Sequence, residues 1–458
     1  MNGRRWPGRS PATTRMAAVA LLALAAAGAL PGPAWAGALI PVNLQAVGHT
    51  DLGGPGGGPW DDVAVVGTTA VVSAVPAACA PSAATVVDLR EPARPRVVAQ
   101  LPVPDGLAVA ALAALHVTTT PFTGDLLAVA VRGCRPDATG AGIRFYDVTD
   151  PASPRPLGRS DGADPQSVSL ALRLDGRVVV AAVVATPGAG GGGLAVELDD
   201  ASDPARPGAL ARWTRPVSDV AACPVQTGDA RLAEGGQRAV VAFDDGRVYD
   251  LGLDDPAQPA TRGSALGDAG GGRDPHAASV PVGRRTLAVV TQGQGRQDDC
   301  TGVPPDRAVR MLALQPPAPV SALATVRYPG TAAPGRIVAS GEQAFVAWHA
   351  DGLRVLDLGA VTPGTVARFV PPDPDVVGVG VLATSVVVTD SRSGLYVLDR
   401  PEEGRRESLW SKIKGAAGFM SIPLLLGAIW AVPRLAMGTA PSASRSRVPV
   451  PAARRRRQ

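Results

Sequence analysis

Aromatic side chains are scarce in this chain of 458 residues, where Phe, Trp and Tyr together make up 4%. A hydrophobic core must therefore be built from Val, Leu and Ala. Lysine is nearly absent too, with two residues against 42 arginines. Long helices are not favoured, because 54 Gly and 45 Pro suit a chain with many tight turns.

Familiar catalytic motifs are also missing. The chain has no H-E-x-x-H and no G-K-[ST] phosphate loop, and it lacks the sialidase Asp box, the Trp motif of quinoprotein propellers and the WD dipeptide pattern. One G-x-S-x-G match, residues 158–162, follows an outer strand in a turn and lacks the strand-to-helix elbow that this motif needs. We therefore expect no cofactor.

The two ends of the chain carry targeting signals. Residues 1–36 are typical of a secretory signal peptide: four arginines precede the apolar run MAAVALLALAAAGAL, and Ala34-Trp35-Ala36 forms a small-residue cleavage site. A retained N-terminal membrane anchor is the alternative interpretation. We expect the mature chain to begin at residue 37.

A second apolar run, GAAGFMSIPLLLGAIWAVP, is 19 residues long and uncharged, close to the roughly 20 residues that span a bilayer. Seven arginines and no acid follow it, which places the C-terminus in the cytoplasm by the positive-inside rule. We expect a juxtamembrane linker at 404–414, a transmembrane helix at 415–437 and a basic cytoplasmic tail at 438–458. With this helix across the cell membrane, the rest of the chain would lie on the extracytoplasmic side. The alternative is a buried or surface-lying helix.

Without its ends the chain is mildly acidic. Residues 37–414 hold 33 basic and all 40 acidic side chains, a balance of −7. Nucleic-acid binding would need a basic surface, so no nucleic-acid partner is expected.

A short pattern recurs through the middle of the chain, in which an apolar triplet, an Asp and a D-P-x-x-P turn precede a second apolar run. The copies are RFYDVTDPASPRPLGR, TVVDLREPARPRVVAQ, AVELDDASDPARPGALAR, RVYDLGLDDPAQPATRG and LRVLDLGAVTPGTVARF, with degraded forms VRMLALQPPAPVSALATV and LYVLDRP. They lie 42 to 63 residues apart, and each follows a Val-, Leu- and Ala-rich run of strand length. This period, built from short strands and turns, is typical of a β-propeller.

These copies resemble the LVIVD repeat, a propeller repeat of bacterial and archaeal surface and secreted proteins. The resemblance covers residues 37–403 and implies an adhesive or interaction role without catalytic residues. It also explains the stretch PVNLQAVGHTDLGG, which resembles the part of a unit that the last copy lacks. The expected fold is all-β, a seven-bladed propeller in which an N-terminal strand closes the last blade, followed by one transmembrane helix.

Three polar residues are candidates for a ligand site at the mouth of the central channel. His116 and His276 each precede a core strand by some ten residues, where an innermost strand would begin, and Asp219 occupies a similar place. Such a trio could bind a metal or polarise a carbonyl, although exposed polar residues at strand starts are common. His49 and His349 are interpreted as ordinary turn or strand-end residues.

Loop lengths indicate which face would bind a partner. The connection between the second and third strands opens on the face where innermost strands begin, and it is long in four units: residues 76–84, 133–142, 186–193 and 292–307. The leading hypothesis is a membrane-anchored module that binds a protein, peptide or envelope glycan without chemistry. The alternative is an exported hydrolase or lactonase using the channel mouth.

The four cysteines form no C-x-x-C and no metal-ligand spacing, which favours disulfides in an exported chain. Cys79 and Cys134 fall in matching loops of consecutive units, and Cys223 and Cys300 fall on the same face of two later ones. The register therefore predicts Cys79 to Cys134 and Cys223 to Cys300, with free thiols as the alternative.

Overall fold

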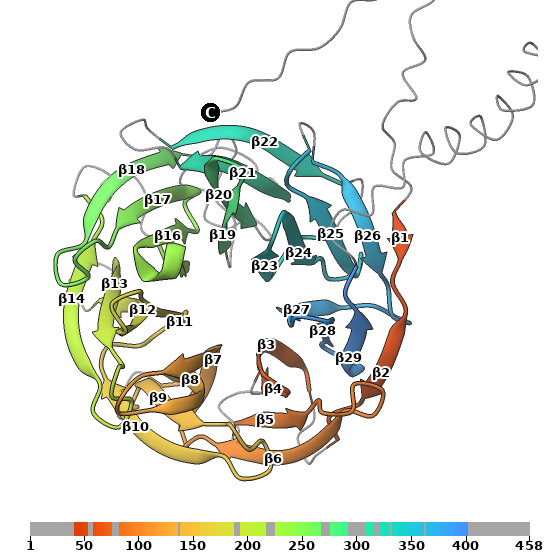
Figure 1. Cartoon of the computed structure of the whole chain (residues 1–458), viewed down its shortest axis with the longest axis horizontal. Coiled ribbons are helices and arrows are strands. Elements are labelled where there is room, and N and C mark those ends of the chain that lie inside the picture. Colours follow the sequence, from red (N-terminus) through yellow and green to blue (C-terminus); the bar gives the residue numbers. More distant parts are fainter. Residues whose placement is uncertain are drawn as a thin grey trace, which may run out of the picture. The chain divides into compact units, whose positions relative to one another are not determined.

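Seven small sheets stand side by side around a central axis in the computed structural model (Figure 1). The structure describes residues 41–53, 58–75, 82–135, 138–186, 193–216, 225–266, 275–291, 307–314, 320–328, 332–360 and 363–401. The expected leader, linker, transmembrane helix and tail lie outside these ranges. Within them, no helix has the length and apolarity needed to cross a bilayer.

Each sheet contains one blade of four strands, with the first strand innermost and the fourth at the rim, and one of the seven sheets has a fifth strand beyond the rim strand (Figure 1). The first six blades take their four strands in chain order. Blade 1 holds β3 (Trp60–Val66), β4 (Thr69–Ala74), β5 (Ala83–Asp88) and β6 (Arg96–Pro102); blade 2 holds β7 (Leu107–Thr118), β8 (Thr123–Gly133), β9 (Gly142–Asp147) and β10 (Arg155–Asp161). Blade 3 holds β11 (Ser169–Leu172), β12 (Val178–Thr186), β13 (Gly193–Asp200) and β14 (Gly208–Thr214); blade 4 holds β15 (Gly228–Ala233), β16 (Arg238–Phe243), β17 (Arg247–Gly252) and β18 (Ala260–Leu266), with a 3-10 turn at Glu234–Gly236.

The last three blades complete the ring. Blade 5 holds β19 (His276–Val282), β20 (Arg285–Thr291), β21 (Ala308–Leu314) and β22 (Ser321–Arg327); blade 6 holds β23 (Ile337–Ser340), β24 (Gln343–Ala347), β25 (Leu353–Asp357) and β26 (Thr365–Phe369). Blade 7 holds β27 (Val376–Val381), β28 (Ser385–Asp390), β29 (Gly394–Asp399) and, as its outer strand, β2 (Ala46–Thr50).

The ring closes as the sequence predicts. β2 pairs antiparallel with β29, placing Ala46 opposite Leu398 and Thr50 opposite Leu395. This pairing joins the two ends of the described chain in one sheet and removes the open edge that an unclosed ring would leave. An addition was not predicted: β1 (Val42–Asn43) pairs in parallel with β26, so the N-terminal segment spans the rims of blades 6 and 7 (Figure 1).

The core is divided among the contacts between neighbouring blades. Each of the seven blade-to-blade contacts holds its own hydrophobic cluster. In β16, Ala239 and Val241 pack toward blade 3, whereas Val240 and Ala242 pack toward blade 5. Successive side chains of a strand point to opposite faces, so a strand between two blades needs apolar residues at every position. This confirms the expected burial of the Val- and Ala-rich runs on both faces.

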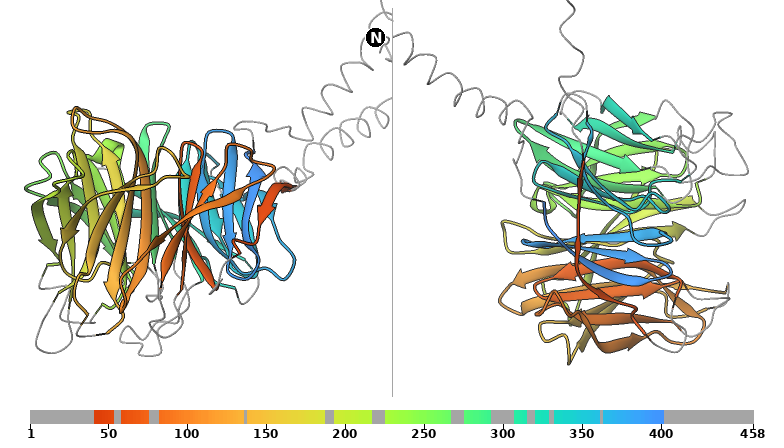
Figure 2. Two further views of the ribbon diagram at one scale, coloured as in Figure 1. Left: turned by 90° about the horizontal axis from the view of Figure 1, so that it is seen from below. Right: turned by 90° about the vertical axis from the view of Figure 1, so that its right-hand side faces the viewer.

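The two faces of the ring differ in construction (Figure 2). We call the face where the innermost strands begin the loop face; it also carries the connections between second and third strands and those between blades. The opposite face, which we call the turn face, carries the D-P-x-x-P turns between third and fourth strands. The four connections predicted to be long do join second to third strands, as the bounds of β4 and β5, β8 and β9, β12 and β13, and β20 and β21 require.

The repeated turn holds its own backbone together. The Asp150 carboxylate accepts a hydrogen bond from the Ala152 amide at 3.2 Å, and the Asp150 carbonyl accepts one from the Ser153 amide at 3.0 Å. Blade 3 repeats the first of these bonds, with the Asp203 carboxylate 3.2 Å from the Ala205 amide. These bonds confirm that the acid caps the turn while proline fixes the bend.

Candidate functional site

The central channel carries a polar cluster in the half that opens on the loop face. Its members come from the innermost strands of different blades, or from the residue just before such a strand. They are Asp62 on β3, Asp229 and Arg231 on β15, His276 on β19 and Arg336 before β23. We call these five residues the channel cluster. Because these strands are mostly apolar and buried, their charged residues need partners nearby, on the same strand or across the channel.

Asp62 is the most heavily bonded member of the channel cluster. One carboxylate oxygen lies 2.6 Å from an Arg336 guanidinium nitrogen, and it also accepts the Leu112 amide of blade 2 at 3.0 Å. The Asp62 side chain is 2% exposed, so the pair is shielded from water. Asp62 therefore joins blades 1, 2 and 6 at one point, where neighbouring innermost strands have no backbone pairing of their own.

Asp229 has a similar position in blade 4. It forms an ion pair with Arg231 at 3.0 Å and accepts the Ala277 amide of blade 5 at 3.0 Å. Burial alone would raise the pKa of Asp229, but Arg231, His276 and Arg336 outweigh it and hold the pKa below its ordinary value. The second carboxylate oxygen of Asp229 is buried without a hydrogen-bond partner.

His276 is the first residue of β19, as the sequence predicts for a channel-mouth residue. Its Nδ1 lies 3.9 Å from the Asp229 carboxylate, beyond hydrogen-bond distance, and has no other hydrogen-bond partner. Burial, followed by the nearby Arg336 charge, lowers the pKa of His276 to about 3. The imidazole is therefore neutral near pH 7, so one ring nitrogen can donate a hydrogen bond and the other can accept one.

The structure does not bring His116 to the same place. The run Leu107–Thr118 is one long innermost strand, β7, so His116 lies near its end rather than at its start. It therefore belongs to the turn face, where its Nδ1 is 2.7 Å from Asp125. The expectation was wrong because LAVAALAAL is itself the innermost strand and precedes His116. Asp219, the third predicted member, lies outside the described residues.

Several members of this region were not singled out from the sequence. His349, interpreted as an ordinary turn residue, lies on the loop face in the turn after β24, with its Nδ1 2.9 Å from Asp375. Asp62 and Asp229 could have been found from an acid within an apolar innermost strand, as in WDDVAVV and GDARLA. Arg336 carries no such signal, because it precedes its strand.

The chemistry open to this cluster is limited by its internal pairing. Asp62 and Asp229 are both held by arginines, and the His276 imidazole lies outside hydrogen-bond distance of the nearer carboxylate. Among the described residues, no group of three His, Cys, Asp or Glu side chains is arranged to hold a metal ion. Asp62 joins blades 1, 2 and 6, and Asp229 joins blades 4 and 5. Within the channel cluster, no nucleophile and base are in mutual contact.

Only part of the cysteine prediction falls on described residues. Cys134 lies in the connection between β8 and β9 on the loop face, and its amide donates to the Gly106 carbonyl at 2.9 Å. Cys79, Cys223 and Cys300 lie outside the described ranges. Both predicted disulfides remain predictions, which peptide mapping under non-reducing conditions would test.

Comparisons with known proteins support the fold. A chain in the crystal structure of the mitotic checkpoint complex is similar over 88% of this chain and 99% of its own length, with a TM-score of 0.52 and 8% identity. The β-propeller domain of Cps50 (Swd1) from Myceliophteria thermophila is similar over 79% of this chain and 100% of its own, with a TM-score of 0.51 and 12% identity. No family model and no curated protein matches, so the LVIVD likeness remains a resemblance. The fold defines the chain as a seven-bladed β-propeller.

Proposed function

We propose that this chain is an exported propeller, anchored in the cell membrane by its C-terminal segment, that binds a partner protein through its loop face without catalysing a reaction. The observation that carries the proposal is the contrast between the faces. Four connections between second and third strands are long, and all four open on the loop face of a rigid ring. Binding residues are commonly placed on loops that a rigid scaffold holds.

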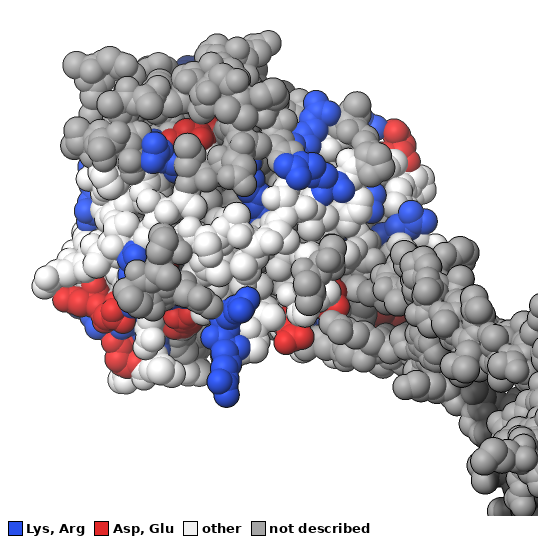
Figure 3. All heavy atoms as spheres, turned by 90° about the horizontal axis from the view of Figure 1, so that it is seen from above, with Lys and Arg blue, Asp and Glu red and all other residues white. Residues whose placement is uncertain are grey.

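The channel cluster supports binding over catalysis. A hydrolase at this mouth would need an activated nucleophile or a metal-bound water within reach of a base. Here the two buried carboxylates are engaged by Arg231 and Arg336, so their charges are already neutralised. The surface charge also fits a protein partner: on the side of the ring in Figure 3, basic and acidic side chains of the described residues are interspersed.

Site-specific photo-cross-linking tests the binding face, because the two faces offer matched positions. Val75, 44% exposed, directly follows β4 on the loop face, and Leu174, 94% exposed, lies in the turn between β11 and β12 on the turn face. A benzophenone amino acid at each position in the full chain, in its own membrane, should yield a cross-linked protein from position 75. Equal yields from both positions, or cross-links from position 174 alone, would overturn the assignment of the loop face.

The membrane anchor needs a separate test. The full chain should stay in the membrane fraction after alkaline carbonate washing, and a chain truncated after Glu407 should be recovered in soluble form. Release of the full chain by carbonate would contradict the anchor while leaving the binding face untouched.

A further inference from the structure

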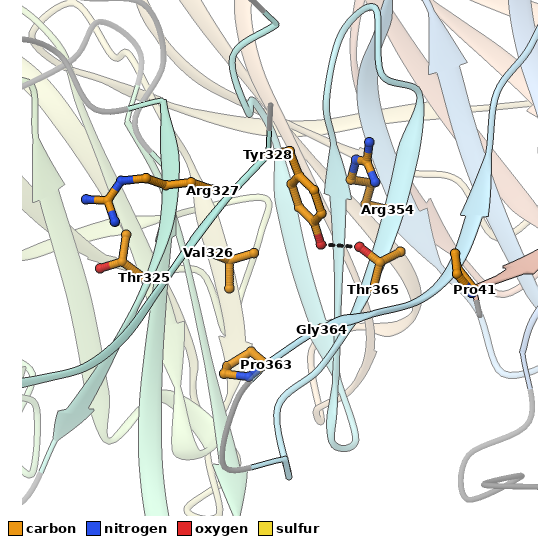
Figure 4. Close-up of a pocket in the computed structure, with 9 residues that line it drawn as sticks. All are labelled: Pro41, Thr325, Val326, Arg327, Tyr328, Arg354, Pro363, Gly364 and Thr365. Atoms are coloured by element: carbon orange, nitrogen blue, oxygen red, sulfur yellow. Dashed lines mark hydrogen bonds between the residues drawn. The ribbon is translucent and has the colours of Figure 1, made fainter. Parts of the chain in front are cut away.

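A pocket of about 420 Å³ opens on the rim where blade 5 meets blade 6. Figure 4 shows Tyr328, just after β22, pointing toward Thr365 at the start of β26, with Val326 and Pro363 beside them and Arg354 next to the ring. The Tyr328 hydroxyl and the Thr365 hydroxyl are hydrogen-bonded. The lining residues are Pro41, Thr325, Val326, Arg327, Tyr328, Arg354, Pro363, Gly364 and Thr365. We call this the rim pocket, and its volume lies within the range of about 300–1,000 Å³ usual for ligand sites.

The equivalent position between blades 3 and 4 is filled. Trp213 is the sixth of seven residues in β14, packs edge-on against Tyr249 and donates its indole N–H to Thr261 at 3.1 Å. Val326 is the sixth of seven residues in β22 and is much smaller. The rim pocket therefore lies where another junction of the same ring places a tryptophan.

The charge at the rim pocket favours an anion. Its nine lining residues include two arginines and no acid. The Arg354 guanidinium stacks 4.0 Å from the centre of the Tyr328 ring and is 17% exposed. Asp351 lies 3.6 Å from this guanidinium, and the Arg354 Nε is buried and has no hydrogen-bond partner. A carboxylate bound at the exposed part of the guanidinium would form charge-assisted hydrogen bonds with it.

The rim also accepts added strands. β1 lies along the outer edge of β26 in the parallel sense, and the Leu44 amide donates to the Arg368 carbonyl at 2.7 Å. In the described part of the chain, no fifth strand covers the outer edge of β22. Because β22 ends at Arg327 beside the pocket, a strand added in parallel to it would bring its carboxyl end to the pocket.

We propose that the rim pocket receives the C-terminal residue of an extended peptide from a partner protein. The peptide backbone lies parallel to β22, its last side chain packs against Val326 and Tyr328, and its terminal carboxylate bonds to Arg354. This site is distinct from the loop face, so it would provide a second point of contact for a partner.

Blocked hexapeptides with free carboxylates test the proposal. The series acetyl-Thr-Val-Thr-Val-Thr-X, with X as Ala, Leu, Phe or Trp, is titrated against the full chain in detergent and followed by saturation-transfer NMR. Members with a large apolar X should bind, and the same peptides with a C-terminal amide should bind about tenfold or more weakly. No binding by any member at about 1 mM, or equal binding of acid and amide, would overturn the proposal.

Two variants and a control keep the result interpretable. Val326→Trp should fill the pocket as Trp213 does elsewhere and abolish peptide binding, while Arg354→Gln should remove the preference for the carboxylate. Leu174→Thr, at a 94% exposed position in the turn between β11 and β12, should leave binding unchanged. If the chain's own residues 37–40 fill the pocket, Val326→Trp will lower the melting temperature and no peptide will bind, which also overturns the proposal.

Discussion

The turn face and the loop face follow different physical rules, although the same strands connect them. On the turn face, Asp150 and Asp203 cap identical turns, and Gly158 fits beneath the next blade's turn so closely that a Cβ would come 2.5 Å from the Pro204 carbonyl oxygen. On the loop face, connections between second and third strands run from three residues, at 244–246, to sixteen, at 292–307. One face is constrained by contact with the next blade, and the other is free to vary.

This contrast separates stability from binding. Repeated residues on the turn face hold blade to blade, so a change there should affect folding. Changes in the variable connections should affect binding. The channel cluster is an exception, because it lies toward the loop face and yet holds blades together through buried charges.

The largest expected effect comes from the channel cluster. Asp62→Ala removes the partner of Arg336 and leaves a buried guanidinium without its 2.6 Å contact. Breaking a buried ion pair in this way costs about 3–5 kcal/mol. The melting temperature of the variant should fall accordingly, and Asp62→Leu combined with Arg336→Met should recover much of the loss. A melting temperature like that of the wild type for Asp62→Ala would show that the pair does not join the blades.

The second effect is a dependence on pH. Because the folded pKa of His276 is lowered to about 3 from its ordinary 6.5, the neutral form is favoured by folding. Its contribution to stability is present above 6.5 and is lost as the pH falls from there toward 3, by at most about 1.4 kcal/mol per pH unit. Asp229, whose pKa is also lowered from its ordinary value of 3.8, adds to the loss of stability only below about pH 3.8.

Urea unfolding at pH 7 and at pH 5 measures this window. The wild type should lose stability between the two values, and His276→Gln should lose less because it has no proton to take up. An equal loss in both proteins would assign the pH dependence to other groups.

A third prediction concerns close packing on the turn face. Gly158→Ala introduces a methyl group against the Pro204 carbonyl, and overpacking of this kind costs about 1–3 kcal/mol. Gly208→Ala is a matched control on the outer strand of the next blade, because a Cβ there meets nothing within 4 Å. The first variant should melt at a lower temperature than the control. Identical melting curves would mean that the blades can move apart at no cost.

Much of the turn face could be predicted from the sequence, whereas the pairing within the channel cluster could not. A D-P-x-x-P turn is local: Asp150 bonds to an amide two residues away, and the pattern recurs. The ring closure by β2 was also predictable, because the missing part of the last unit stands at the N-terminus. Asp62 and Arg336 are 274 residues apart and meet through the curvature of the ring, which no local pattern encodes. His116 was misplaced because β7 has no polar residue to mark its start.

The smallest effect on stability should come from the loop face. Thr186 and Gly193 are paired opposite each other at the ends of β12 and β13, so Asn-Gly can replace residues 187–192 as a two-residue hairpin turn. Shortening this connection from six residues to two reduces the entropy cost of closing it by about 1 kcal/mol, so the variant should melt at the same temperature or slightly higher. Cross-linking of the partner from position 75 should nevertheless weaken if this connection contributes to the binding face. A large fall in melting temperature would show that the loop face, like the turn face, is constrained by packing, and the distinction between the two faces would then fail.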